Sequence, residues 1–348
     1  MATKRRKKRK YNTFKLIYIA FVLGVSMLLS AWIIMSVNEL LALARPDYEV
    51  IIEIPENASH GDVAKILKKN DIIEHRVLFT MFATVSKRGV EYPAGEYKIN
   101  SNMDYRAMLR RLTSKKGQLN TVMVTIPEGY EVSQIVDLLV EKGVCERDEL
   151  EDVVANTDFD YEFLKELPLG KSNRLEGYLF PDTYEFYKND EPSRVVKKFL
   201  DNFNIKFNEE MEKRAKELGM TTHELITFAS IVEREATAKD RENIASVFHN
   251  RLKNKTYPYL ESCATVQYVL GERKKVISIA DTKIDNKYNT YKYKGLPPGP
   301  IANPGLDAIE ASLYPNETDY LFFALQEDGT HKFSRTYEEH LSTPKLNP

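Results

Sequence analysis

The sequence predicts an α+β protein in three parts: an N-terminal transmembrane helix, a small α+β module, and a larger mixed domain rich in helix. Three observations support this fold class. A long uncharged segment follows a basic N-terminus, a strand-and-helix pattern occurs twice, and helical periodicity dominates from about residue 145. The chain has 348 residues, 43% of them hydrophobic, which is enough for several folded domains.

Charge is unevenly distributed, although the net charge is only -1. Residues 1–15 carry eight Lys or Arg side chains and no acidic one, so the rest of the chain holds 42 basic against 51 acidic residues. An acidic body argues against nucleic acid as a partner, because phosphate binding needs clustered positive charge. The basic run lies just before an apolar segment, which favours a role in membrane topology.

Residues 16–37 are 22 consecutive uncharged residues. As a helix they span about 33 Å, enough to cross the hydrocarbon core of a bilayer. A cleavable signal peptide is the alternative, and Ala42-Leu43-Ala44 offers a cleavage motif. Signal peptides, however, have apolar regions of only roughly 7–15 residues. We therefore expect a single-pass anchor in the cell membrane, with the N-terminus in the cytoplasm and the chain from about residue 38 outside.

Two segments share a pattern at an offset of 72 residues. Residues 54–57 are Ile-Pro-Glu-Asn and residues 126–129 are Ile-Pro-Glu-Gly, each between an apolar extended stretch and apolar residues at helical spacing. Each copy predicts a strand, a turn and an amphipathic helix. Such small α+β units resemble LysM modules, which often bind carbohydrate. The alternative is that the two units only pack together as scaffold.

The remaining sequence predicts further elements. Thr221 and Glu224 form a capping pattern at the start of the clearest helix, Pro192–Leu218 has helical periodicity, and residues 320–333 predict a closing hairpin. A long irregular stretch rich in Pro, Gly and Tyr follows Leu252, and such loops are usually functional. The predicted parts are a basic cytoplasmic tail (1–15), a transmembrane helix (16–37), a stalk (38–48), a LysM-like module (49–118) with a hinge at 115–117, and a larger domain (119–348) that begins with the second strand-and-helix copy (121–145).

Several kinds of chemistry lack their signatures in this sequence. It contains no Gly-x-Ser-x-Gly, no His-Glu-x-x-His, no phosphate-binding loop and no dinucleotide fingerprint, and its six histidines lack ligand spacing. The single Ser-x-x-Lys match, at 342–345, contains a proline. Cys145 and Cys263 are far apart, so we expect two buried free thiols rather than a zinc site or a disulfide scaffold. We therefore predict no metal and no cofactor, which leaves carboxylate chemistry.

One carboxylate continues the apolar stripe of the helix that begins at Thr221. At about 100° per residue, Glu235 follows Phe228 and Val232 on that stripe, while Glu233 falls on its flank and Arg234 on the opposite, polar face. Desolvation on an apolar face raises the pKa of a carboxyl group, which is what a general acid near neutral pH needs. Most glutamates at helix ends are solvated or paired, so this pattern alone does not assign catalysis.

Four motifs resemble the YceG-like (MltG) endolytic murein transglycosylases. They are Leu-Glu-Gly-Tyr-Leu-Phe-Pro-Asp-Thr-Tyr at 175–184, Ala-Ser-Ile-Val-Glu-Arg-Glu at 229–235, Ala-Ser-Val-Phe-His-Asn-Arg-Leu at 245–252, and Tyr-Asn-Thr-Tyr at 288–291 followed by Gly-Leu-Pro-Pro-Gly-Pro-Ile-Ala-Asn-Pro-Gly at 295–305. The resemblance covers nearly the whole chain. It implies that residues 119–348 are a YceG-like catalytic domain.

The resemblance also implies an activity. The family are lyases that cut the bond between N-acetylmuramic acid and N-acetylglucosamine without water and leave a 1,6-anhydro end. On nascent strands this would terminate glycan elongation. The second glutamate of the Ile-Val-Glu-x-Glu motif, Glu235, is implied to be the single general acid and base. Peptidoglycan is the expected substrate, and cell-wall synthases are further expected partners.

This chain departs from the family pattern at two places. Ala236 stands where a threonine often follows the catalytic glutamate, and an aspartate is missing after Leu260. A non-catalytic peptidoglycan-binding membrane scaffold and a two-carboxylate muramidase remain alternatives, and the muramidase would leave a reducing end. Glu176 and Asp182 are expected to be structural, and Cys263 to line the cleft. The candidate substrate contacts are Glu233, Tyr288, Asn289, Tyr291, Ser262 and Gln267.

Overall fold

The computed structural model describes residues 5–43, 45–86, 91–114, 117–274 and 276–343. The chain forms two compact units, Met1–Asn120 and Thr121–Pro348. Two residues of the predicted hinge, Lys115 and Lys116, lie outside the described residues, as do the first four residues of the basic tail.

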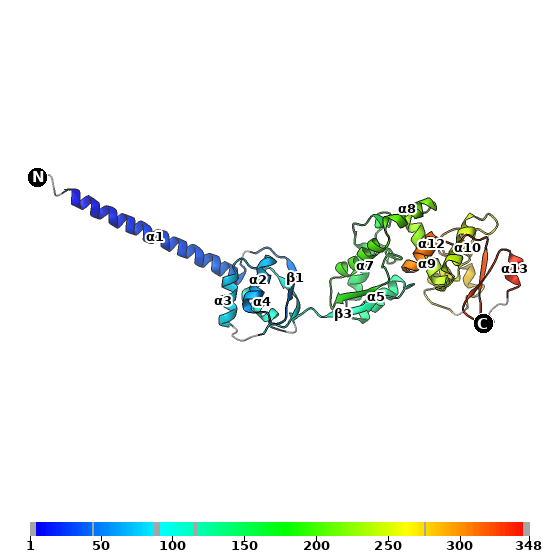
Figure 1. Ribbon diagram of the computed structural model, residues 1–348, viewed down its shortest axis with the longest axis horizontal. Coiled ribbons are helices and arrows are strands. Elements are labelled where there is room, and N and C mark those ends of the chain that lie inside the picture. Colours follow the sequence, from blue (N-terminus) through cyan, green and yellow to red (C-terminus); the bar gives the residue numbers. More distant parts are fainter. Residues whose placement is uncertain (1–4, 44, 87–90, 115–116, 275, 344–348) are drawn as a thin grey trace. The chain divides into compact units, whose positions relative to one another are not determined.

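The first element, α1, is a helix over Arg5–Leu41 (Figure 1). Among the described residues it contains the one helix, Phe14–Leu41, with the length and composition to cross a membrane. The helix continues into the stretch where the sequence predicted a stalk, so residues 38–41 are helical. This extension has a physical reason: Glu39 is buried and Leu40 packs against the core of the module that follows.

That module, the N-terminal module, covers its small antiparallel sheet with helices. Glu49 lies opposite Asn100 in the two strands, and Ile54 opposite Gly95. Ile52, Leu67 and Phe79 are buried in its core. Two of its helices, α3 and α4, were not anticipated from the sequence. The elements are β1 (Glu49–Ile54), α2 (His60–Lys69), α3 (Arg76–Ser86), β2 (Gly95–Asn100) and α4 (Tyr105–Leu112).

The second unit begins with the second copy of the repeat. Both copies form a strand followed by a helix, but the strands find different partners. β1 pairs within the N-terminal module, whereas β3 (Thr121–Thr125) pairs antiparallel with the distant β4 (Thr183–Tyr187). The helices between β3 and β4 are α5 (Val132–Glu141), α6 (Arg147–Asn156) and the 3-10 turn η2 (Glu162–Leu164).

Helices dominate the rest of this unit. The helical stretch predicted at Pro192–Leu218 is two helices, because the side chain of Asn208 caps a new helix by accepting from the backbone of Met211 at 3.0 Å. The predicted hairpin is present, with Phe322 opposite Ser334. The elements are α7 (Pro192–Lys206), α8 (Glu209–Glu217), α9 (Thr222–Glu235), α10 (Arg241–Lys253), α11 (Cys263–Leu270), η3 (Asp281–Lys283), α12 (Leu306–Leu313), β5 (Phe322–Leu325), β6 (His331–Ser334) and α13 (Tyr337–Leu341).

Helix α9 lies at the centre of the second unit and packs against α8, α10, α11 and α12 (Figure 1). Thr221 and Glu224 form the expected capping box at its start. The polar residues opposite the apolar stripe include Thr227 and Ser230, and both are buried. Ser230 donates to the carbonyl of Thr227 at 2.7 Å and accepts from the backbone N–H of Ile301 at 3.0 Å. Backbone groups within and beside α9 therefore supply the hydrogen bonds that this buried polar side chain needs.

Candidate active site

Glu235 is the last residue of α9 and faces the first turn of α11. Its Oε1 accepts a hydrogen bond from the Ser262 hydroxyl at 2.5 Å and another from the backbone N–H of Ala264 at 3.1 Å. Ser262 immediately precedes α11, so the carboxylate lies at the positive end of that helix dipole. Both hydrogen bonds within the described part of the chain go to Oε1, which leaves Oε2 for a ligand.

Two opposing effects set the pKa of Glu235. Burial is the larger and raises the pKa, because a charge is disfavoured away from water; the hydrogen bonds from Ser262 and Ala264 lower it by stabilising the carboxylate. The net change is upward. Such a group stays protonated closer to neutral pH, and its carboxylate form keeps two donors. It is therefore suited both to give and to take a proton.

Ser262 provides a hydroxyl to Glu235 although position 236 has none. Ala236 has no hydroxyl to offer where the family often has threonine. The Ser262 hydroxyl reaches the carboxylate from 27 residues farther along the chain. The packing of α11 against α9 brings it there. The missing threonine does not leave the acid without a hydroxyl partner.

Glu233 points to a different set of partners. Its Oε2 accepts from the backbone N–H of Gly305 at 3.2 Å, and Oε1 lies 3.8 Å from the guanidinium of Arg241. Its side chain is largely buried, and burial raises its pKa to about 7, opposed first by the hydrogen bond from Gly305. Gly305 precedes α12, so Glu233 ties the end of α9 to the start of α12.

The two cysteines are free and differ in environment. Cys145 is buried, as expected, but Cys263 is exposed, so the prediction of two buried thiols is wrong for Cys263. Its sulfur lies 3.1 Å from the hydroxyl of Tyr291. Because Cys263 directly follows Ser262, this contact brings Tyr291 beside the Glu235 site.

Two of the candidate substrate contacts are used inside the protein. Asn289 is fully buried, and its side-chain amide donates to the carbonyls of Thr282 and Ile284 at 3.0 and 2.8 Å. Gln267 donates to the carbonyl of Lys274 at 2.8 Å. These amides organise loops, which argues against direct contact with a ligand.

Tyr288 lies where a ligand could reach it. It lines two cavities of about 460 and 550 Å³, which share Asn173 and Glu176. Its ring centroid lies 5.1 Å from that of Tyr268. Cavities of this size can hold a small molecule, and polar and charged side chains make up much of both linings.

Asn303 joins segments that are far apart in the sequence, a role the sequence did not reveal. It donates to Glu176 at 3.1 Å and to the carbonyl of Tyr130 at 2.9 Å, and it accepts from the backbone of Leu179 at 2.8 Å. Glu176 also accepts from the backbone of Val132 at 3.0 Å. The only available signal was the place of Asn303 in the stretch at 295–305.

Glu176 and Asp182 act structurally, as expected. Glu176 is buried within the Asn303 contacts, and burial raises its pKa to about 8. Asp182 accepts from the backbone of Thr183 at 2.8 Å and from Asn202 at 3.1 Å. Neither carboxylate is hydrogen-bonded to Glu235.

Comparison with known proteins gives consistent matches. The model of the YceG-like family matches residues 52–345. An endolytic murein transglycosylase of Bacillus subtilis (strain 168) is 36% identical over 302 residues, covering 84% of this chain and 82% of that protein. One of Streptococcus pneumoniae is 31% identical over 320 residues, covering 84% of this chain and 57% of that protein.

A crystal structure of a yceG-like protein from Listeria monocytogenes is also similar. It matches with a TM-score of 0.57 and 30% identity, covering 85% of this chain and 99% of that one. The family model spans most of this chain, and the Bacillus subtilis relative matches over most of its own length. The chain therefore belongs to the YceG-like family.

Proposed function

We propose that this protein is an endolytic murein transglycosylase that cuts the bond between N-acetylmuramic acid and N-acetylglucosamine in nascent glycan strands. The observation that carries the proposal is the Glu235 carboxyl group. It is half-buried at the end of α9, desolvation raises its pKa, and Ser262 and Ala264 hold one of its oxygens. The names of the relatives support the same activity.

Glu235 serves as both acid and base in this proposal. Its proton goes to the glycosidic oxygen as the bond to C1 of muramic acid breaks, and the leaving strand departs with a hydroxyl. The muramic acid C6 hydroxyl then attacks C1 and gives its proton to the Glu235 carboxylate. The products are a 1,6-anhydro end and a regenerated acid, and no water is consumed. Hydrolytic glycosidases, in contrast, usually need two carboxylates.

The neighbouring groups fit this single-acid scheme. Ser262 and Ala264 stabilise the carboxylate between the two proton transfers, when it is charged. Glu233 is bound to Gly305 and Arg241, so it is the supporting carboxylate in this scheme. Tyr288 and Tyr291 are the tyrosines that we propose contact the sugars. Cutting nascent strands in this way would end their elongation, and cell-wall synthases would be the partners that supply them.

Residues 14–41 are proposed as a single-pass membrane anchor, and the N-terminal module as a LysM-like unit that binds glycan. The length and composition of α1 and the basic residues before it support the anchor. The small sheet covered by helices supports the module. Protease added to intact cells should remove an epitope placed beyond residue 50. Protection of that epitope would reverse the topology and would put the domain on the wrong side of the membrane to cut nascent glycan strands.

Glu235→Gln and Glu233→Gln test the chemistry as a matched pair. Glutamine keeps the shape and the acceptor oxygen but donates no acidic proton. Glu235→Gln should lower release of anhydro-muropeptides from purified peptidoglycan by about 10²–10⁴-fold, the range for losing general acid–base catalysis. Glu233→Gln should cost much less. Mass spectrometry gives the product, and circular dichroism checks the fold.

Each other outcome has a definite meaning. Loss of activity in Glu233→Gln alone would reverse the two roles. Full activity in both variants would place the chemistry elsewhere. Reducing ends in place of anhydro ends would indicate hydrolysis. A wild-type protein that binds glycan but releases no fragments would be a scaffold.

A further inference from the structure

Helix α3 carries an apolar stripe that no described residue of the N-terminal module covers. Val77, Met81 and Val85 are 72%, 62% and 81% exposed. Their spacing of four residues places them on one side of the helix. On the other side Phe79 and Ala83 are fully buried in the core of the N-terminal module. The helix is thus apolar on both sides.

Polar groups on α3 do not offset this stripe. The hydroxyl of Thr80 donates to the carbonyl of Arg76 at 2.8 Å, and that of Thr84 donates to the carbonyl of Thr80 at 2.7 Å. Both hydroxyls therefore form their hydrogen bonds within the helix. The sequence from His75 to Val90 contains no acidic residue, and its charged residues are Arg76, Lys87 and Arg88. An apolar stripe between basic residues suits an anionic lipid surface.

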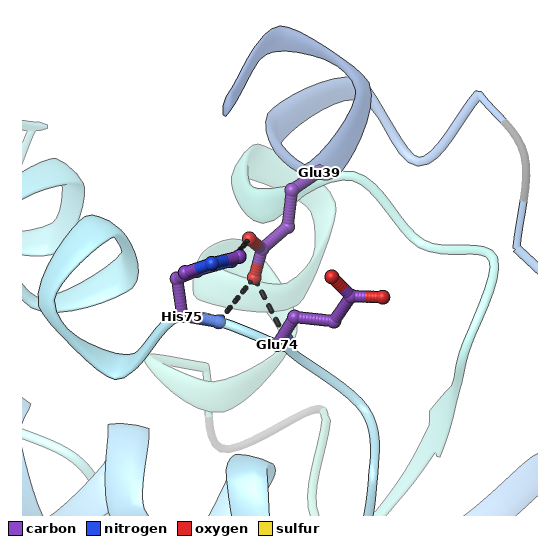
Figure 2. A group of neighbouring side chains, drawn as sticks. All are labelled: Glu39, Glu74 and His75. Atoms are coloured by element: carbon purple, nitrogen blue, oxygen red, sulfur yellow. Dashed lines mark hydrogen bonds and ion pairs between the residues drawn. The ribbon is translucent and has the colours of Figure 1, made fainter. Parts of the chain in front are cut away.

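The start of α3 is bonded to the end of α1 (Figure 2). Glu39 accepts from the backbone N–H groups of Glu74 and His75, both at 2.8 Å, and it contacts the His75 ring. It also accepts from the Tyr105 hydroxyl at 2.6 Å. A carboxylate on the free N–H groups before a helix is a stabilising cap.

Arg45 strengthens the same connection. It donates to the carbonyl of Ile72 at 2.5 Å and to that of Glu39 at 3.0 Å. Glu39, Glu74 and His75 also bring possible ligand atoms within 4.8 Å of one another. Both Glu39 oxygens are already engaged, however, so the cluster is a helix cap and carries no metal proposal. α3 therefore begins where the apolar segment of α1 ends.

We propose that α3 lies in the headgroup region of the outer leaflet of the cell membrane, with Val77, Met81 and Val85 in contact with the acyl chains of the lipids. The proposal rests on the membrane anchor proposed above. The cap connects the start of α3 to the helix that would cross the bilayer, so α3 begins near the membrane surface, where its exposed stripe can reach the lipids. The N-terminal module would then touch the membrane at two points and could not swing freely on one helix.

Tryptophan fluorescence with brominated lipids tests this contact in the full chain. Trp32 is the single tryptophan and lies in α1, so the wild-type protein reports on the anchor. A Trp32→Phe background then receives Met81→Trp or, as a second position, Val77→Trp. Glu53→Trp is the matched control, because Glu53 is exposed on β1, across the module from α3 (Figure 1). All variants are reconstituted into phosphatidylcholine–phosphatidylglycerol vesicles with brominated acyl chains.

The expected result is blue-shifted emission that bromine quenches at positions 81 and 77, and unquenched emission at position 53. Retained glycan cleavage and circular dichroism show that each variant is folded. Quenching of Trp32 without quenching at 81 and 77 would overturn the α3 proposal while the anchor stands. An unquenched Trp32 would overturn the anchor, and the α3 proposal with it. Blue-shifted but unquenched emission at 81 and 77 would mean that protein covers the stripe, and would also overturn the proposal.

Discussion

The carboxylate of Glu235 accepts a hydrogen bond from the hydroxyl of Ser262 at 2.5 Å, which joins the end of α9 to the start of α11. The hydroxyl stabilises the charged form, so removing it should raise the pKa of Glu235 further. Activity that requires the protonated acid falls as the pH rises through this pKa. Ser262→Ala should therefore shift the alkaline limb of the pH–rate profile to higher pH, by on the order of one pH unit.

The pH profile of glycan cleavage measures this effect. Ser246→Ala is the matched control, because Ser246 is equally buried but bonds Thr318 at 2.7 Å instead of the acid. Its profile should keep the wild-type limb. An alkaline limb in Ser262→Ala that does not move, or that moves to lower pH, would contradict the role given to the hydroxyl.

Gly177 is required by both its backbone and its neighbours. Its φ is +88°, and a Cβ there would lie 2.6 Å from a carbon of Pro300 and 2.7 Å from one of Ile226. Gly219 has a similar φ of +77° with nothing within 4 Å. Gly219→Ala should cost roughly 1–2 kcal/mol for the left-handed backbone. Gly177→Ala should cost a further 1–3 kcal/mol for overpacking.

Thermal or denaturant unfolding of the two variants separates these contributions. The difference between them isolates the contacts of Gly177 with Pro300 and Ile226. Equal losses of stability would mean that the surrounding chain relaxes and that the close approach of Pro300 is unimportant.

Glu176 should make stability depend on pH in an unusual direction. Its pKa is about 8 in the folded protein and its ordinary value is 4.5, so the folded state holds the proton more tightly. The resulting stabilisation is complete below pH 4.5 and is lost as the pH rises toward 8. In the wild type, Glu176 should lower the free energy of unfolding by on the order of 1 kcal/mol for each pH unit in this range. Glu176→Gln, which cannot titrate, should lack this contribution. Glu233, with a pKa of about 7, should leave a residual slope over the narrower range from pH 4.5 to 7.

Urea unfolding at several pH values between 4.5 and 8 measures this slope. Glu149→Gln is a suitable control because Glu149 is exposed on α6. Identical slopes in wild type and Glu176→Gln would show that Glu176 does not hold its proton in the folded state.

Removal of Glu39 should weaken the start of α3. Glu39→Ala leaves the N–H groups of Glu74 and His75 and the hydroxyl of Tyr105 without this acceptor. Loss of a cap alone costs about 0.5–2 kcal/mol. Hydrogen exchange at residues 74 and 75 should therefore accelerate. Glu74→Ala, which removes an exposed side chain and keeps the cap, should leave the exchange at residue 75 unchanged; faster exchange in both variants would point to general loosening.

Local signals were enough to predict several elements. The capping box of Thr221 and Glu224 spans four residues, and the hairpin of β5 and β6 joins neighbouring segments. The long apolar helix also follows from composition alone. In each case the residues that stabilise the element lie close together in the sequence, so their pattern is visible without the fold. Membership of the family was recognised from continuous motifs in the same way.

Other features depend on contacts between distant segments. Ser230 on α9 is buried because the backbone of Ile301 comes to meet it, and β3 pairs with a strand that lies beyond two helices. The amide of Asn289 has the chemistry of a sugar contact but is used within its own loop. Periodicity describes which side of an element is apolar, but it does not say which segment will cover the polar side.

The sequence by itself determined the order of the parts, the long apolar helix, and the candidate acid Glu235 through its motif. Only the tertiary structure decided what surrounds that acid: the hydroxyl of Ser262 and the N–H of Ala264 on one oxygen, with Glu233 turned toward Gly305. It also decided that Glu39 caps α3. The physical reason is that a carboxylate takes its pKa and orientation from the donors and the burial around it, and here the chain brings those donors from 27 to 72 residues away.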